Sequence, residues 1–167
     1  MVIFDSSTLI LIAKIEILDI FLNSVTMKVV IPNAVENECC GDRKTFDALT
    51  IRKVLEDGRI AVKSVNNESI VAKLQSDFNM GRGESESIAL AFEHKANLVA
   101  IDDRKGIQAC KLSGIAFTTA IGILVRSSRK GLLNRVQAQE KLASLARFAR
   151  YKPAILEDAK SQLERLK

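Results

Sequence analysis

Four acidic residues, Asp5, Glu38, Glu84 and Asp102, each follow or begin an apolar stretch of the chain. In such positions their side chains can point inward at one edge of a sheet. Two carboxylates repel each other by about 1 kcal/mol at roughly 4 Å even in water. A fold that gathers four of them therefore predicts a bound metal cation. Carboxylate oxygens are hard ligands, which suit Mg²⁺ or Mn²⁺.

Each of these acids also has a structural alternative that the sequence leaves open. Asp5 has the side chain of an N-cap for the helix that follows it. Glu38 lies on a helix, where solvent exposure is the usual fate of a glutamate. Asp102 and its neighbour Asp103 follow an apolar run, so they are equally suited to beginning a turn or capping the next helix.

Two glutamates compete for the third position, because Glu84 and Glu86 both stand near the start of one predicted helix. Negative charge in the first turn is stabilised by the helix dipole, which is their structural alternative. At 100° per residue, Glu84 lies one turn before Ile88, on the face that also carries Ala91 and Phe92. We expect Glu86 nearer the outer side. Glu84 is the predicted ligand, and Glu86 is a supporting residue or an alternate.

Cations accompany the acids in the sequence. Arg82, Arg104 and Lys105 flank them and are candidates for holding substrate phosphates, with surface solvation as the alternative role. Residues 126–167 hold eleven Lys or Arg against four acids, a net charge of +7, so the first 125 residues carry −2. A basic end on a slightly acidic body is able to recruit a polyanion.

The hydrophobic pattern predicts strands that alternate with helices. The expected strands are residues 1–4, 27–31, 60–65, 98–101 and 115–118. The expected helices are residues 8–14 (capped by Ser6 or Ser7), 15–22, 32–40, 44–57, 68–78, 84–95 and 104–112, with a mostly helical remainder. This order predicts a parallel sheet covered on both faces, whose ligands bind at the carboxyl ends of the strands near the switch in strand order. Asp5 and Asp102 are expected at those ends.

The composition is that of an ordinary globular domain, with 167 residues, 47% hydrophobic and 27% charged. We see no signal peptide or membrane-spanning run and expect a cytoplasmic protein. Cys39, Cys40 and Cys110 form no CxxC pair, and with the single His94 they do not make an ordinary zinc site. Buried free thiols are therefore expected.

Four segments in register resemble the PIN-domain nucleases over roughly the first 120 residues. They are VIFDSS at 2–7, IPNAVENE at 31–38, GESESIALA at 83–91 and LVAIDDR at 98–104. The strings Gly-Glu-x-Glu-x-Ile-Ala-Leu-Ala and Ile-Asp-Asp-Arg-Lys-Gly further resemble a prokaryotic branch related to VapC-type toxins of toxin–antitoxin pairs.

The resemblance implies a three-layer α/β/α sandwich with a central, mainly parallel sheet and an acidic pocket for Mg²⁺ or Mn²⁺. It assigns the catalytic and metal-binding roles, in order, to Asp5, Glu38, Glu84 and Asp102, with Asp103 sharing or replacing the last. Ser7 matches a hydroxyl residue that supports the first acid. The chain departs from the family pattern in two ways, since the third acid is more often Asp and Ala100 stands where a hydroxyl residue is usual.

The function expected from these features is metal-dependent hydrolysis of RNA by a single domain of residues 1–167, with helices from about residue 119 packed on it. A toxin role would imply an antitoxin partner. A homodimer is also expected, with apolar residues of 121–125 or the last helix as contacts. The alternative is a non-cleaving RNA- or protein-binding module on the same fold. A phosphatase or receiver domain is a third reading, but Asp5 lacks the acidic neighbour that a receiver needs, and no GxxxxGK[ST] loop supports an NTPase.

Overall fold

A five-stranded parallel sheet forms the centre of the structure, a computed structural model that describes residues 1–165. The strand order is β3-β2-β1-β4-β5. The strands are β1 (Val2–Phe4), β2 (Val29–Pro32), β3 (Ala61–Lys63), β4 (Leu98–Ala100) and β5 (Phe117–Thr118). The chain moves outward from β1 through β2 to β3 and then returns to add β4 on the other side of β1. The switch in strand order therefore lies between β1 and β4.

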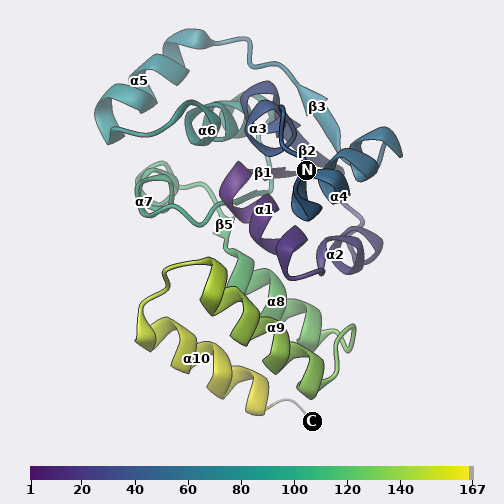
Figure 1. Cartoon of the computed structure of the whole chain (residues 1–167). Coiled ribbons are helices and arrows are strands. Elements are labelled where there is room, and N and C mark those ends of the chain that lie inside the picture. Colours follow the sequence, from purple (N-terminus) through teal and green to yellow (C-terminus); the bar gives the residue numbers. More distant parts are fainter. Residues whose placement is uncertain (166–167) are drawn as a thin grey trace.

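Helices connect and cover the strands (Figure 1). They are α1 (Ser6–Lys14), α2 (Leu18–Ser24), α3 (Asn33–Cys39), α4 (Phe46–Glu56), α5 (Glu68–Phe78), α6 (Arg82–His94), α7 (Arg104–Leu112), α8 (Ala120–Arg129), α9 (Arg135–Phe148) and α10 (Pro153–Glu164). No helix within residues 1–165 is both long and apolar enough to cross a membrane.

Alternate strand residues face two separate hydrophobic cores, as the period of two in a strand requires. Val2 and Phe4 of β1 lie in the core that contains residues of α1, α2, α4 and α8–α10. Ile3, between them, lies in the other core with residues of α5, α6 and α7. Helices thus cover both faces of the sheet, and the predicted three-layer α/β/α sandwich is confirmed.

Two helices begin earlier than their sequences predict, and both begin at the acidic edge. Asp5, and not Ser6 or Ser7, is the N-cap of α1. Helix α6 begins at Arg82 rather than at residue 84, because the carboxylate of Glu84 reaches back to accept a hydrogen bond from the N–H of Gly81. Gly81 is therefore the N-cap of α6, and Arg82 and Gly83 belong to its first turn.

The prediction that Glu86 lies toward the outer side of α6 is wrong. Glu86 and Leu90 are 5% and 0% exposed, whereas Phe92, expected on the inner face, is 41% exposed. The reason is that α6 contacts the sheet and is also contacted by α3, α5 and α7, so most of its circumference is buried. A face assignment from periodicity assumes one buried stripe, and this helix has more than one.

The edge strand β3 also differs from expectation. It is only three residues long, where a strand over residues 60–65 was expected, and all three residues are half-buried. The three cysteines are free and buried, as expected.

The last three helices form a layer of their own, drawn in green to yellow in Figure 1. Helix α8 contacts α1 and α2, α9 contacts α1, and α10 packs on α8 and α9. Four of the five apolar residues expected to be free for dimer contacts, Ile121 and Ile123 to Val125, are instead buried in α8. The last two residues of the expected domain 1–167 lie outside the described residues.

A candidate acidic site at the carboxyl edge of the sheet

Asp5 stands directly after β1, at the switch in strand order, and is 1% exposed. One carboxylate oxygen, Oδ2, accepts hydrogen bonds from the backbone N–H of Ser7 at 3.1 Å and from the Ser7 hydroxyl. The other oxygen, Oδ1, is buried without a hydrogen-bond partner in the described residues. Most buried polar atoms have such a partner, so this oxygen calls for an explanation.

Burial raises the pKa of Asp5 to about 7. The two hydrogen bonds from Ser7 act in the opposite direction, and the negative charges of Glu84 and Glu38 raise the pKa further. Ionising Asp5 in this position near neutral pH therefore costs free energy. A cation beside Oδ1 would reverse that balance, because an opposite charge favours the ionised form.

Glu38 reaches from α3 to the first turn of α6. Its carboxylate accepts hydrogen bonds from the hydroxyl of Ser6 at 2.5 Å and from the N–H of Gly83 at 3.2 Å. Glycine at position 83 permits this close approach, since a Cβ there would lie 2.7 Å from both carboxylate oxygens of Glu38 and would displace them.

Glu84 occupies the same turn of α6 and is half-buried. Burial raises its pKa, the N–H of Gly81 counteracts this through a 2.5 Å hydrogen bond, and the charges of Asp103 and Glu38 raise it again. Lys105 lowers it. The structure thus brings Asp5, Glu38 and Asp103 near enough to Glu84 for their charges to interact with its charge.

Asp102 is held differently from these four. Its Oδ2 accepts hydrogen bonds from the Thr8 hydroxyl and the Ala120 N–H, both at 2.8 Å, and its Oδ1 accepts one from the Tyr151 hydroxyl at 2.5 Å. Asp103 uses Oδ1 to cap α7, accepting hydrogen bonds from the N–H groups of Lys105 at 2.7 Å and Gly106 at 3.2 Å. These contacts favour Asp103 as the acid that faces Glu84. Asp102 instead connects the segments of Thr8, Ala120 and Tyr151 at the carboxyl edge of the sheet.

Glu86 lies outside this group of interacting acids. Its two oxygens accept hydrogen bonds from the Ala34 N–H at 3.0 Å and from Arg82 Nε at 2.6 Å. The carboxylate therefore stabilises the beginning of α3. Arg82 is engaged too, since its Nη2 lies 2.8 Å from Glu68. Of the predicted alternates, Glu84 is the one near the other acids.

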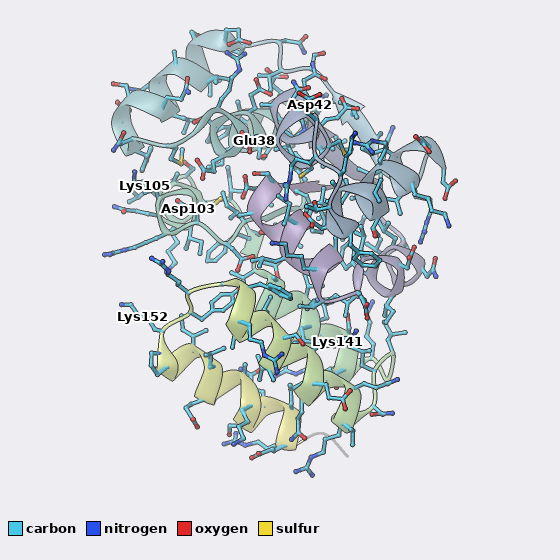
Figure 2. The ribbon with its side chains drawn as sticks, viewed as in Figure 1. Glu38, Asp42, Asp103, Lys105, Lys141 and Lys152 are labelled. Carbon is cyan, nitrogen blue, oxygen red and sulfur yellow. The ribbon has the colours of Figure 1, made fainter. Side chains whose placement is uncertain are left out.

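The other predicted phosphate-binding residues lie at the start of α7. Arg104 is exposed, and Lys105 donates a hydrogen bond from Nζ to the carbonyl oxygen of Asn79 at 2.5 Å. In Figure 2, Lys105 and Asp103 appear together at this helix end, and Glu38 lies above and to the right of them in that view.

The donor set fits a hard divalent cation by its chemistry, because it consists of carboxylate oxygens and includes one buried oxygen without a partner. In the described residues, no three His, Cys, Asp or Glu side chains lie at the mutual spacing of a preformed metal site. The acids interact through their charges without meeting at one point.

Three contributors to this edge carry no signal in the sequence. Thr8 and Tyr151 bond to Asp102 from distant segments, and Ser6 bonds to Glu38 across 32 residues. Gly83 is different, because a glycine directly before an acid at a helix start indicates a close approach of another group.

Comparison with protein-family models identifies a family for the chain. The family model DUF3368, described as a PIN domain, matches residues 1–165. No curated protein is significantly similar to the chain.

Proposed function

The chain belongs to the PIN-domain family, and from this premise we propose that it is a divalent-metal-dependent endoribonuclease. PIN domains are in general nucleases, which are hydrolases of phosphodiester bonds and act on nucleic acid. The finer parts of the proposal are that the substrate is RNA, that cleavage is internal, and that the cation is Mg²⁺ or Mn²⁺.

One observation carries the proposal, the buried Oδ1 of Asp5 that has no partner in the described residues. A carboxylate whose pKa is raised to about 7 beside two further acids is costly to keep ionised. Capping α1 uses only Oδ2 of Asp5, the oxygen that accepts both hydrogen bonds from Ser7. If Oδ1 had no function, Asn at position 5 would cap the helix without the cost of ionising a buried carboxylate.

The residues that would hold the cation are Asp5, Glu38, Glu84 and either Asp103 or Asp102. When bound, a divalent cation neutralises charge on the phosphoryl oxygens and lowers the pKa of a water nucleophile. Ser7 fixes the orientation of Asp5 through two hydrogen bonds to Oδ2.

The cations at the start of α7 would complete the site by holding the substrate. Arg104 and Lys105 would contact its phosphates, since they lie next to Asp103 and are exposed. Arg82 is a weaker candidate for this role, because Glu86 and Glu68 both engage it.

Cleavage of a labelled single-stranded RNA in Mn²⁺ or Mg²⁺ tests the proposal. We expect the wild type to produce internal cuts and Asp5→Asn to produce none. Asp57→Asn, at the exposed C-cap of α4, is the matched control and should cut as the wild type does. Thermal melting gives a second readout, because a cation that binds only the folded state raises the melting temperature. The proposal fails if neither metal cuts RNA or moves the melting temperature.

We also propose that the chain is a cytoplasmic prokaryotic protein of the VapC-related branch, acting as the toxin of a toxin–antitoxin pair. The motif strings at 83–91 and 101–106 support this. Expression in a bacterial host should arrest growth, and Asp5→Asn should not.

Co-purification with the product of an adjacent gene would identify the antitoxin, and light scattering would test the homodimer. Limited proteolysis would test the single domain.

The second candidate is a module on the same fold that binds RNA or protein without cleaving. The absence of a preformed three-ligand cluster in residues 1–165, together with the engagement of Asp102 by three donors, favours it. RNA binding that persists in EDTA, with no cleavage in any divalent metal, would identify this function. Hydrolysis of a phosphomonoester would point to the phosphatase reading instead.

A further inference from the structure

The segment 149–152, which joins α9 to α10, is anchored at the acidic edge. The hydroxyl of Tyr151 donates a hydrogen bond to Asp102 Oδ1 at 2.5 Å, and Asp102 directly precedes the N-cap of α7. A chain segment from the basic end of the sequence is thereby fixed beside the acids.

The two residues that flank Tyr151 are cations with nothing to neutralise them. Arg150 and Lys152 are exposed, and neither has an ion-pair or hydrogen-bond partner for its side chain in residues 1–165. Lys152 is also the N-cap of α10, whose first turn contains no acid, so the positive end of that helix adds to the local charge.

These charges add to those already described at the start of α7. Arg104 and Lys105 stand at the start of α7, immediately after Asp103, while Arg150 and Lys152 flank Tyr151, whose hydroxyl donates its hydrogen bond to Asp102. Lys105 and Lys152 are on the same side of the molecule in Figure 2, and in that view Asp103 lies between them. Cations from two separate segments of the chain therefore lie near Asp102 and Asp103.

A polyanion that approaches a cluster of carboxylates is repelled unless nearby cations hold its backbone. We propose that residues 149–152 form a phosphate-binding loop for single-stranded RNA, in which Tyr151 fixes the loop to Asp102 while Arg150 and Lys152 contact the RNA backbone. The inference rests on the proposed function for its ligand. It adds a second pair of phosphate-binding cations to the pair at the start of α7.

The test is RNA binding measured without cleavage. Fluorescence anisotropy of a labelled single-stranded RNA is recorded in EDTA over a range of salt concentrations. Removing one cation that binds a phosphate lowers the slope of log K against log salt by about 0.7 for a single strand, which corresponds to roughly fivefold in affinity at about 0.1 M salt. Arg150→Ala with Lys152→Ala should therefore lower the slope by about 1.4 and the affinity about 25-fold.

The matched control is Lys53→Ala with Lys160→Ala, which removes the same net charge. Both lysines are exposed helix residues without an ion-pair partner in residues 1–165, and neither helix carries one of the predicted acids. We expect the control to keep the wild-type slope. Both double variants should keep the wild-type melting temperature, since none of the four side chains is buried.

The inference is overturned if the loop variant and the control weaken RNA binding equally, or if the wild type does not bind RNA in EDTA. It is also overturned if the loop variant keeps its RNA affinity and binds a polyglutamate peptide more weakly, because the loop would then serve an acidic protein. If the loop variant binds RNA more weakly as expected but no divalent metal supports cleavage, the loop is retained and the endoribonuclease proposal fails.

Discussion

Asp5→Asn should stabilise the metal-free protein at and above neutral pH, and by an amount that grows with pH. Asp5 binds its proton more tightly when folded than when unfolded, since its pKa rises from 3.8 to about 7. The stability that this protonation supplies is complete below pH 3.8 and is lost as the pH rises from 3.8 to about 7. At about 1.4 kcal/mol per pH unit, ionised Asp5 destabilises the folded state by about 4 kcal/mol at pH 8.

Asparagine removes this dependence but adds a constant cost. Its carbonyl oxygen can accept both hydrogen bonds from Ser7, and its NH₂ group then occupies the place of the unpartnered Oδ1. An unsatisfied buried donor costs about 1–3 kcal/mol at any pH. Because this cost is the same at every pH, the change in stability with pH reports the ionisation of Asp5 alone. Between pH 5 and pH 8, the stability of Asp5→Asn relative to wild type should grow by about 3 kcal/mol.

The assay is urea unfolding in EDTA at pH 5, 6, 7 and 8, followed by circular dichroism. Asp57→Asn is the control, whose difference from the wild type should be the same at every pH. A flat difference for Asp5→Asn as well would refute the reasoning, because Asp5 would then be ionised without cost. Adding Mn²⁺ at pH 8 should stabilise the wild type and leave Asp5→Asn unchanged.

Three further substitutions test the contacts around the acids. Gly83→Ala should displace Glu38, whose oxygens lie 2.7 Å from the added Cβ, and so reduce the rise in melting temperature on adding Mn²⁺ while adding up to about 1 kcal/mol of helix propensity. A Mn²⁺-dependent rise equal to that of the wild type would contradict this. Glu86→Gln should destabilise the protein by about 1–3 kcal/mol in urea unfolding, because it breaks the ion pair with Arg82, and it should leave the Mn²⁺ response intact. Tyr151→Phe should cost about 1 kcal/mol in the same measurement and weaken RNA binding in EDTA. An unchanged RNA affinity would show that the hydrogen bond does not position the loop.

The sequence predicted the sheet well, because its strands are short apolar runs bounded by turn and cap residues. Helix α5 and helix α7 have the expected bounds, residues 68–78 and 104–112. The start of α6 was wrong because a glycine-rich tripeptide usually forms a turn, and here the carboxylate of Glu84 turns it into a helix start.

The faces of α6 were predicted poorly for a physical reason. Periodicity locates one apolar stripe, and the buried Glu86 satisfies its charge with Arg82 and a backbone N–H from another helix. The periodicity of one helix does not reveal a hydrogen-bond partner in another helix, such as the Ala34 N–H that Glu86 engages. The same holds for the choice between Asp102 and Asp103, since Thr8 and Tyr151 decide which carboxylate is engaged.

The bond between Tyr151 and Asp102 has a consequence for the timing of assembly. A ribosome synthesises the polypeptide from its N-terminus, so Asp102 emerges 49 residues before Tyr151, the residue that donates this hydrogen bond. Until then the nascent chain lacks one of the donors that fix this carboxylate. Any activity that depends on that hydrogen bond is confined to molecules whose synthesis has passed the segment between α9 and α10.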